Sequence, residues 1–137
     1  MKGKTFPVST SRKIERRDVT EEVRKAVASL RLRNGFVVVS VPHTTAAVTV
    51  GENWDADVGS DLERALAAWT PAVQFDHGEG NSAAHFLSEA IGNARLLPVE
   101  EGELRLGRWQ GVFLVELDGP RERGVSVDAL GASETGA

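Results

Sequence analysis

The sequence predicts an α+β fold: a compact single domain in which a mixed or antiparallel β-sheet sandwich carries about three helices. Three observations support this prediction. Apolar residues recur at helical spacing in three segments, each bounded by capping or breaking residues. The other apolar segments are short, rich in β-branched residues and separated by glycine- or proline-containing turns, as in strands. The length of 137 residues, with 41% hydrophobic and 26% charged residues, suits one domain spanning 1–137.

The chain is predicted to begin with strands and a helix. Residues 4–17 read as one or two strands that break around Pro7 to Ser11. Asp18 or Thr20 can cap the helix that follows, and Asn34-Gly35 ends it. The apolar stripe of this helix is Val19, Val23, Ala26, Val27 and Leu30.

Two strands and a second helix follow. Residues 36–41 are a nearly continuous β-branched run, which predicts a strand covered on both faces, and residues 46–50 read as the next strand. The second helix is capped by Asp57 or by Ser60, and Pro71 stops it.

The third helix begins near Asn81 and ends at Gly92-Asn93. Its predicted buried stripe is Ala83, Phe86, Leu87, Ala90 and Ile91. His85 projects about 160° from the centre of that stripe. We therefore expect His85 to face water, a partner subunit or a ligand.

The last third of the chain is predicted to be β-structure. Candidate strands are residues 95–99, 103–106, 110–117 and 124–127. Residues 129–137 are small and polar and are predicted to form a frayed tail.

Composition excludes several classes of function. The formal net charge of −4 argues against a nucleic-acid binder, and no apolar run approaches the roughly 20 residues that cross a bilayer. The N-terminus lacks the apolar segment of a secretory signal. There are no cysteines, which excludes disulfides, thiolate nucleophiles and cysteine-bound zinc. We expect a cytoplasmic protein that binds neither nucleic acid nor membrane.

All three histidines lie in chain breaks or on polar faces. His43 follows a strand, His77 lies in a glycine-flanked loop and His85 lies in the first turn of a helix. Three neutral imidazoles with an open fourth position make a catalytic zinc site, in which Glu79 would act as the base or would orient a ligating imidazole. The alternative is three surface histidines with no common role.

Three carboxylates precede the second helix. Glu52, Asp55 and Asp57 lie within six residues, and carboxylates with water suit Mg²⁺, which can bridge to a diphosphate. The alternative is that these side chains cap the helix and complement its dipole.

Two further segments can hold an anion. Thr44 and Thr45 follow His43 at a strand end, where hydroxyls and consecutive amides can meet a negative group. The helix N-terminus at Asn81-Ser82 is the second candidate.

The segment before the strand at 110–117 can bind a planar ring. Trp109 can stack on the ring, and Gln110 can read its edge by hydrogen bonding, unless the tryptophan simply packs at the strand entrance. Arg121 follows a turn, where it can clamp a phosphate or pair with Asp118.

At these residues the chain resembles the YjbQ-like family, also called the secondary thiamine-phosphate synthase family. Four blocks carry the resemblance: His43 to Ala47, Glu52 to Val58, His77 to His85, and Leu106 to Gly111 running on to Glu116 to Arg121. The sequence departs from the family at Arg108 (usually Thr), Ala56 (often Pro) and Val115 (commonly Cys). No departure removes a charged group or an imidazole, and Arg108 adds a cation beside the tryptophan.

The resemblance implies an α+β homotrimer with a weak thiamine-phosphate synthase activity. That reaction joins a pyrimidine-methyl diphosphate to a thiazole phosphate and releases pyrophosphate. The three histidines and Arg121 would contact phosphates, and either the histidines (zinc) or the acidic trio (magnesium) would hold any metal. Two alternatives stay open: a metal-dependent phosphoester hydrolase that uses the three histidines, and a non-catalytic trimeric protein that binds a phosphate-bearing small molecule.

Overall fold

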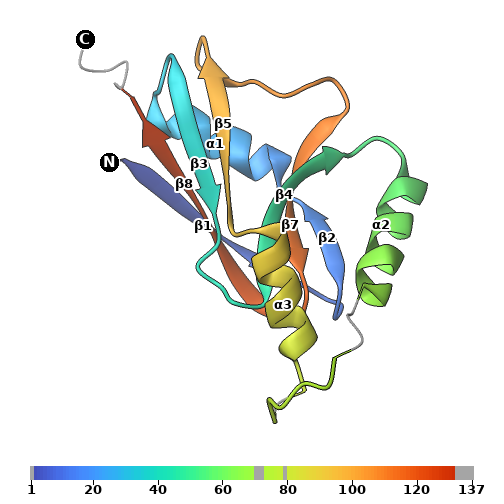
Figure 1. The fold of residues 1–137 in the computed structure, drawn as a ribbon. Coiled ribbons are helices and arrows are strands. Elements are labelled where there is room, and N and C mark those ends of the chain that lie inside the picture. Colours follow the sequence, from blue (N-terminus) through green and yellow to red (C-terminus); the bar gives the residue numbers. More distant parts are fainter. Residues whose placement is uncertain (1, 70–72, 79, 132–137) are drawn as a thin grey trace.

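Two antiparallel sheets and three helices make up the part of the chain that the computed structural model describes, residues 2–69, 73–78 and 80–131 (Figure 1). One sheet has the strand order β1-β8-β3-β5-β6 and the other β2-β7-β4. The strands are β1 Gly3–Ser9, β2 Glu15–Asp18, β3 Gly35–Ser40, β4 Ala46–Glu52, β5 Ala94–Glu100, β6 Glu103–Leu104, β7 Gln110–Glu116 and β8 Glu122–Leu130. The helices are α1 Thr20–Leu30, α2 Ala56–Ala68 and α3 Ser82–Ile91. The predicted α+β class is confirmed.

The main core lies between α1 and the two sheets. Along β3 the residues alternate, with Val37 and Val39 buried but Phe36 47% exposed. The predicted coverage of this strand on both faces is therefore wrong: one face packs into the core while the other is partly open. Other core side chains come from α1, β4, β7 and β8: Val23, Val27, Val48, Leu114, Val125 and Val127.

The N-terminal boundaries differ from the prediction. Strand β1 continues through Pro7, which lies opposite Gly124 of β8, so the break comes only after Ser9. The N-cap residue of α1 is Val19, so neither predicted cap, Asp18 or Thr20, occupies that position; Asp18, one residue earlier, accepts the N–H of Thr20 at its Oδ1 over 2.9 Å. The helix ends before the predicted Asn34-Gly35, because Arg31 adopts a left-handed backbone with φ of 55°.

Helix α2 stands at the side of the molecule, next to β2 (Figure 1). Asp55 caps it by accepting the N–H of Asp57 over 2.8 Å, so the predicted caps Asp57 and Ser60 are wrong. Not one residue of α2 is buried, although it has an apolar stripe. Glu63 connects α2 to β2 and to the segment before it, because it accepts hydrogen bonds from Arg12 Nη1 at 2.7 Å and from the N–H of Arg16 at 2.7 Å.

Helix α3 has the predicted extent, but its buried face is rotated. Ala84, Leu87 and Ser88 are buried, whereas Phe86 is 39% exposed. The reason is that Ser88 donates its hydroxyl to the carbonyl of Ala46, 2.7 Å away, and so turns its own face toward β4.

The C-terminal strands match the prediction closely. Strand β8 continues to Leu130, so Ala129 and Leu130 of the predicted tail pair with β3, and residues 132–137 lie outside the described residues. Among the described helices, none combines the length and apolar character that a bilayer crossing requires.

Candidate functional site

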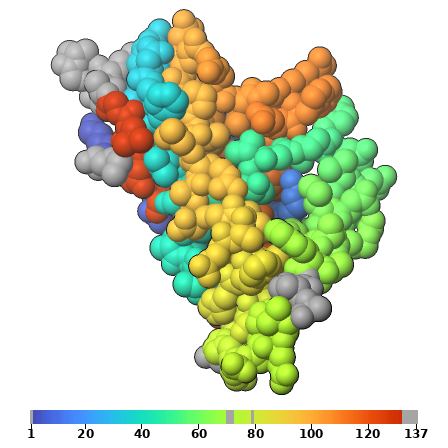
Figure 2. Space-filling view, in the orientation of Figure 1, coloured from blue at the N-terminus to red at the C-terminus, as the bar shows by residue number. Residues whose placement is uncertain are grey.

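The three histidines meet at one end of the molecule. His43, after β3, and His85, in the first turn of α3, line the same cavity of about 500 Å³. The ring of His77 lies edge-on against that of His85, with ring centroids 5.7 Å apart. The remaining lining residues are Thr44, Ser88, Glu89, Gly92 and Asn93. Helix α3 and the segment before it project at this end, the lower one in Figure 2.

His43 is held in one orientation by the backbone of β8. Its Nε2 accepts the N–H of Gly124 over 2.9 Å. A nitrogen that accepts a hydrogen bond carries no proton, so in the neutral ring the proton sits on Nδ1. Burial lowers the pKa of His43, and the positive charge of Arg123 lowers it further, so the ring is neutral at pH 7.

A buried ion pair lies next to the chain segment that carries His43. Glu116 is fully buried at the end of β7 and binds Arg123 through both carboxylate oxygens. Glu116 also accepts from the hydroxyl of Thr10 at 2.7 Å and from the N–H groups of Leu117 and Asp118. Burial raises the pKa of Glu116, but the hydrogen bonds from Arg123, Thr10 and the N–H of Asp118, together with the positive charge of Arg123, lower it overall.

Arg123 connects this pair to the loop that carries His43. Its Nη2 donates to the carbonyl of Thr45 at 3.0 Å and to the hydroxyl of Thr45 at 2.9 Å. Thr45 is therefore buried below the surface, unlike Thr44, and its hydroxyl is engaged within the protein rather than offered to a substrate. The sequence patterns assigned no role to Glu116 and Arg123. The feature that could have identified Glu116 is its position as an acidic residue at the end of an apolar strand.

Asn81 and Arg121 meet at Asp118, beside the start of α3. Asn81 Nδ2 donates to Asp118 Oδ2 at 2.9 Å, and Arg121 Nη2 lies 3.0 Å from the same oxygen. These two partners lower the pKa of Asp118, Asn81 more strongly than Arg121. The buried Oδ1 of Asn81 has no hydrogen-bond partner within the described residues. Arg121 therefore adopts the predicted alternative of pairing with Asp118.

The first turn of α3, which carries His85, has no side-chain cap. Asn81 is the N-cap residue, but its side chain makes no capping hydrogen bond, and Ser82 is the first helical residue. First-turn N–H groups that lack such a partner can receive an anion.

Two of the three carboxylates predicted for magnesium, those of Glu52 and Asp55, accept hydrogen bonds from the backbone. Glu52 accepts from the N–H groups of Trp54 and Asp55 at 3.2 Å, and Asp55 caps α2. Within residues 2–69, 73–78 and 80–131, no group of three or more His, Cys, Asp or Glu side chains is placed to hold a metal ion. Glu79, the predicted base, lies outside the described residues. The zinc and magnesium assignments stay predictions.

Trp109 belongs to an exposed aromatic cluster that the sequence patterns only partly identified. Its ring lies edge-on against Trp54, with centroids 4.9 Å apart, and the guanidinium of Arg108 lies 4.7 Å from its centroid. Trp54 is 75% exposed, so the cluster offers an open aromatic face. Trp54 was not predicted as part of this cluster, although a tryptophan within a polar segment could have indicated an exposed aromatic side chain.

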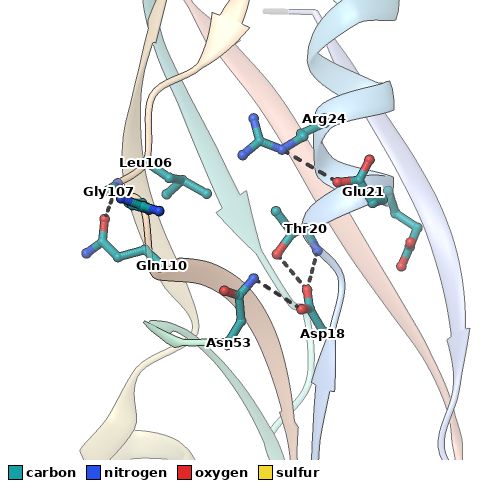
Figure 3. A pocket seen from close by; sticks show the side chains of 10 residues that line it. Asp18, Thr20, Glu21, Arg24, Asn53, Leu106, Gly107 and Gln110 are labelled. Carbon is teal, nitrogen blue, oxygen red and sulfur yellow. Dashed lines mark hydrogen bonds and ion pairs between the residues drawn. The ribbon is translucent and has the colours of Figure 1, made fainter. Parts of the chain in front are cut away.

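Gln110 lines a separate, strongly polar pocket of about 370 Å³ (Figure 3). Its Oε1 accepts from the N–H of Gly107 at 2.8 Å. Asn53 and Asp18 also line this pocket, and Asn53 Nδ2 donates to Asp18 Oδ2. The amide of Gln110 is thus already oriented by its own loop.

The histidine cavity lies at one end of the β4–β7 strand pair, and Trp109, Gln110 and the acidic trio lie at the other end. In the β4–β7 ladder, Glu52 is opposite Gln110 at one end and Ala46 is opposite Glu116 at the other. Six steps along a strand span about 20 Å. Within one chain, the histidines therefore meet one another, but they do not meet Trp109, Gln110 or the acidic trio.

Comparison with known proteins agrees with the fold. Residues 4–132 match the family model described as UPF0047 protein YjbQ-like. The UPF0047 protein YugU of Bacillus subtilis strain 168 is 38% identical over 130 residues, which cover 93% of this chain and 98% of YugU. The crystal structure of the hypothetical protein APE1520 from Aeropyrum pernix K1 is 38% identical and superposes with a TM-score of 0.89, covering 96% of this chain and 100% of that one. The conserved hypothetical protein TT1486 from Thermus thermophilus is 44% identical, with a TM-score of 0.82 and coverage of 92% and 98%. The chain belongs to the YjbQ-like UPF0047 family.

Proposed function

We propose that this protein binds a phosphate-bearing small molecule at the histidine cavity and has a weak thiamine-phosphate synthase activity there. The observation that carries the proposal is the convergence of His43, His77 and His85 beside the uncapped N-terminus of α3. Imidazole N–H groups and free backbone N–H groups are both donors to phosphate oxygens.

The reaction needs stabilisation of a leaving diphosphate more than it needs a base. The thiazole nitrogen forms a bond to the methylene carbon as the carbon–oxygen bond breaks, and the bonding electrons leave with pyrophosphate. No proton has to be removed for this step. Donors fixed around the developing charge, such as His43 and His85, supply the kind of stabilisation that lowers such a barrier.

A site that combines the ring-binding residues with the histidine cavity requires a second subunit. Trp109 and Gln110 lie about 20 Å along the strands from the histidine cavity. We propose that the chain assembles as a homotrimer in which the Trp109 end of one subunit lies near the histidine end of the next. Helix α2, which buries none of its own residues, and the exposed side chains of Trp54 and Trp69 give this assembly apolar surface to cover.

Two measurements on the full chain test the proposal. Isothermal titration calorimetry with inorganic pyrophosphate should detect binding, and incubation with the two phosphorylated precursors should yield thiamine phosphate by mass spectrometry. Each is run after chelator treatment and again with added Mg²⁺ or Zn²⁺, together with elemental analysis of protein purified without chelator.

The outcomes separate the candidate functions. Binding and product formation support the synthase, and binding without product leaves a small-molecule binding protein. Hydrolysis of a phosphoester that depends on about one bound zinc per chain would favour the hydrolase instead. Absence of pyrophosphate binding under every condition would refute the phosphate site.

A further inference from the structure

Glu116 and Arg123 form a buried ion pair that contacts the chain segment carrying His43. The side chain of Glu116 is 0% exposed and that of Arg123 is 5% exposed. A buried pair of this kind adds little net stability, because desolvation of both charges offsets their attraction. Its contacts point to another role.

The pair fixes both chain segments that hold His43. Arg123 binds the carbonyl and the hydroxyl of Thr45, two residues after His43. The residue after Arg123 is Gly124, whose N–H is the donor to His43 Nε2 at 2.9 Å. A single side chain thus sets the distance between the loop that carries the imidazole and the backbone group that holds it.

This arrangement determines which ring nitrogen faces a ligand. Because Nε2 is occupied as an acceptor, the group left for the cavity is the Nδ1–H donor. Metal-binding histidines have the opposite arrangement, in which the second nitrogen donates its proton to an outer oxygen. A donor facing the cavity suits a ligand with acceptor oxygens.

We propose that Glu116 and Arg123 are positioning residues that hold His43 as a neutral Nδ1–H donor toward a ligand oxygen in the cavity. Only the identity of that ligand as a phosphate compound rests on the proposed function. The tautomer and its dependence on the ion pair stand independently of it.

Nitrogen-15 NMR of the imidazole rings tests the tautomer directly. The chain has only three histidines, so the variants His77→Asn and His85→Asn assign the His43 signals. In the wild-type protein at neutral pH, His43 should show a protonated Nδ1 and an unprotonated Nε2. A wild-type His43 protonated at Nε2 would overturn the proposal without any further variant.

Glu116→Gln and Arg123→Lys test the role of the pair. Lys cannot bind Glu116 and Thr45 together in the geometry of the guanidinium fork. We expect both variants to populate the Nε2–H tautomer and to bind inorganic pyrophosphate about tenfold more weakly, the loss of one charge-assisted hydrogen bond. If Arg123→Lys does not fold, Thr45→Ala removes one hydroxyl partner and is examined in the same way.

Glu63→Gln is the matched control, because it weakens the Arg12–Glu63 ion pair away from the cavity. It should leave both the tautomer and pyrophosphate binding unchanged. A pure Nδ1–H signal in folded Glu116→Gln and Arg123→Lys would show that the pair does not position His43. If wild-type protein shows the Nδ1–H tautomer but no pyrophosphate binding, the proposed function fails while the positioning role stands.

Discussion

The ring of His77 lies edge-on against the ring of His85, at a centroid distance of 5.7 Å. The contact joins the exposed loop before α3 to the first turn of that helix, where His85 also borders the cavity shared with His43. Neither His77 nor His85 contributes to the main core. The cluster can therefore be altered without disturbing the packing between the sheets and α1.

Replacing His85 with alanine should abolish synthase turnover and weaken pyrophosphate binding by about tenfold or more, because a phosphate donor is lost. The free energy of unfolding should change by no more than about 0.5 kcal/mol, as for other substitutions outside the core. Calorimetry and urea denaturation measure the two effects. Lys25→Ala, on an exposed position of α1, serves as the control and should change neither. Full turnover by folded His85→Ala would contradict the assignment.

Removing one partner of the buried ion pair should destabilise the protein strongly. Glu116→Ala leaves the buried guanidinium of Arg123 without its carboxylate, and we expect a loss of about 3–5 kcal/mol. The double variant Glu116→Leu with Arg123→Met removes both charges and should cost less than Glu116→Ala alone. Denaturant unfolding of the two variants gives the comparison. A double variant as unstable as the single one would show that the pair contributes net stability.

The carboxylate of Glu116 should make the protein more sensitive to acid. Its pKa in the folded protein lies below the ordinary value of 4.5, so the unfolded chain binds the proton more tightly. The stabilising contribution is complete above pH 4.5 and is lost as the pH falls through the lower, folded-state value. The stability difference between wild type and Glu116→Gln should therefore narrow on acidification. Urea unfolding at a series of pH values tests this, and a constant difference would contradict it.

Helix α2 should loosen when Glu63 is removed. Glu63 accepts hydrogen bonds from Arg12 and from the backbone of Arg16, and α2 has no fully buried residue, although its partly buried Leu66 packs against the smaller core cluster. In Glu63→Ala we expect faster amide hydrogen exchange over residues 56–68 and unchanged exchange in β3 and β8. Glu21→Ala on α1 is the control. Unchanged exchange in α2 would mean that other contacts hold the helix.

Periodicity predicted the elements well wherever the side-chain pattern depends on local burial. The three helices and the strand at 110–117 follow from apolar spacing. The predicted helix boundaries are wrong where a single hydrogen bond determines them, as at the start of α2, which Asp55 caps. The predicted buried face of α3 is wrong because Ser88, a polar residue, is buried and donates a hydrogen bond to the carbonyl of Ala46.

The candidate site was predictable only in part. Histidines on polar faces indicated a site, and the structure brings their rings together. The positions of Trp109 and the acidic trio at the far end of β4 and β7 depend on strand direction, which no local pattern contains. The Glu116–Arg123 pair likewise depends on how β7 and β8, which belong to different sheets, approach each other, although the two residues are only seven positions apart in the sequence.

If the site is completed across subunits of the proposed homotrimer, two defective variants should complement each other. His85→Ala damages the histidine end, and Trp109→Ala damages the ring-binding end, about 20 Å away in the same chain. Random trimers from an equal mixture would place an intact His85 beside an intact Trp109 at roughly a quarter of the sites. After unfolding and refolding together, the mixture should recover about that fraction of wild-type synthase turnover.

The separately refolded variants, mixed afterwards, are the control and should stay inactive, because no subunits have exchanged. Analytical ultracentrifugation confirms that the refolded species has three chains. A site formed within one chain would give no recovery at all, since every chain in the mixture carries one defect. The same mixture with His85→Ala and His43→Ala should also stay inactive, because both changes damage the same end of the chain and no pairing of subunits can restore it.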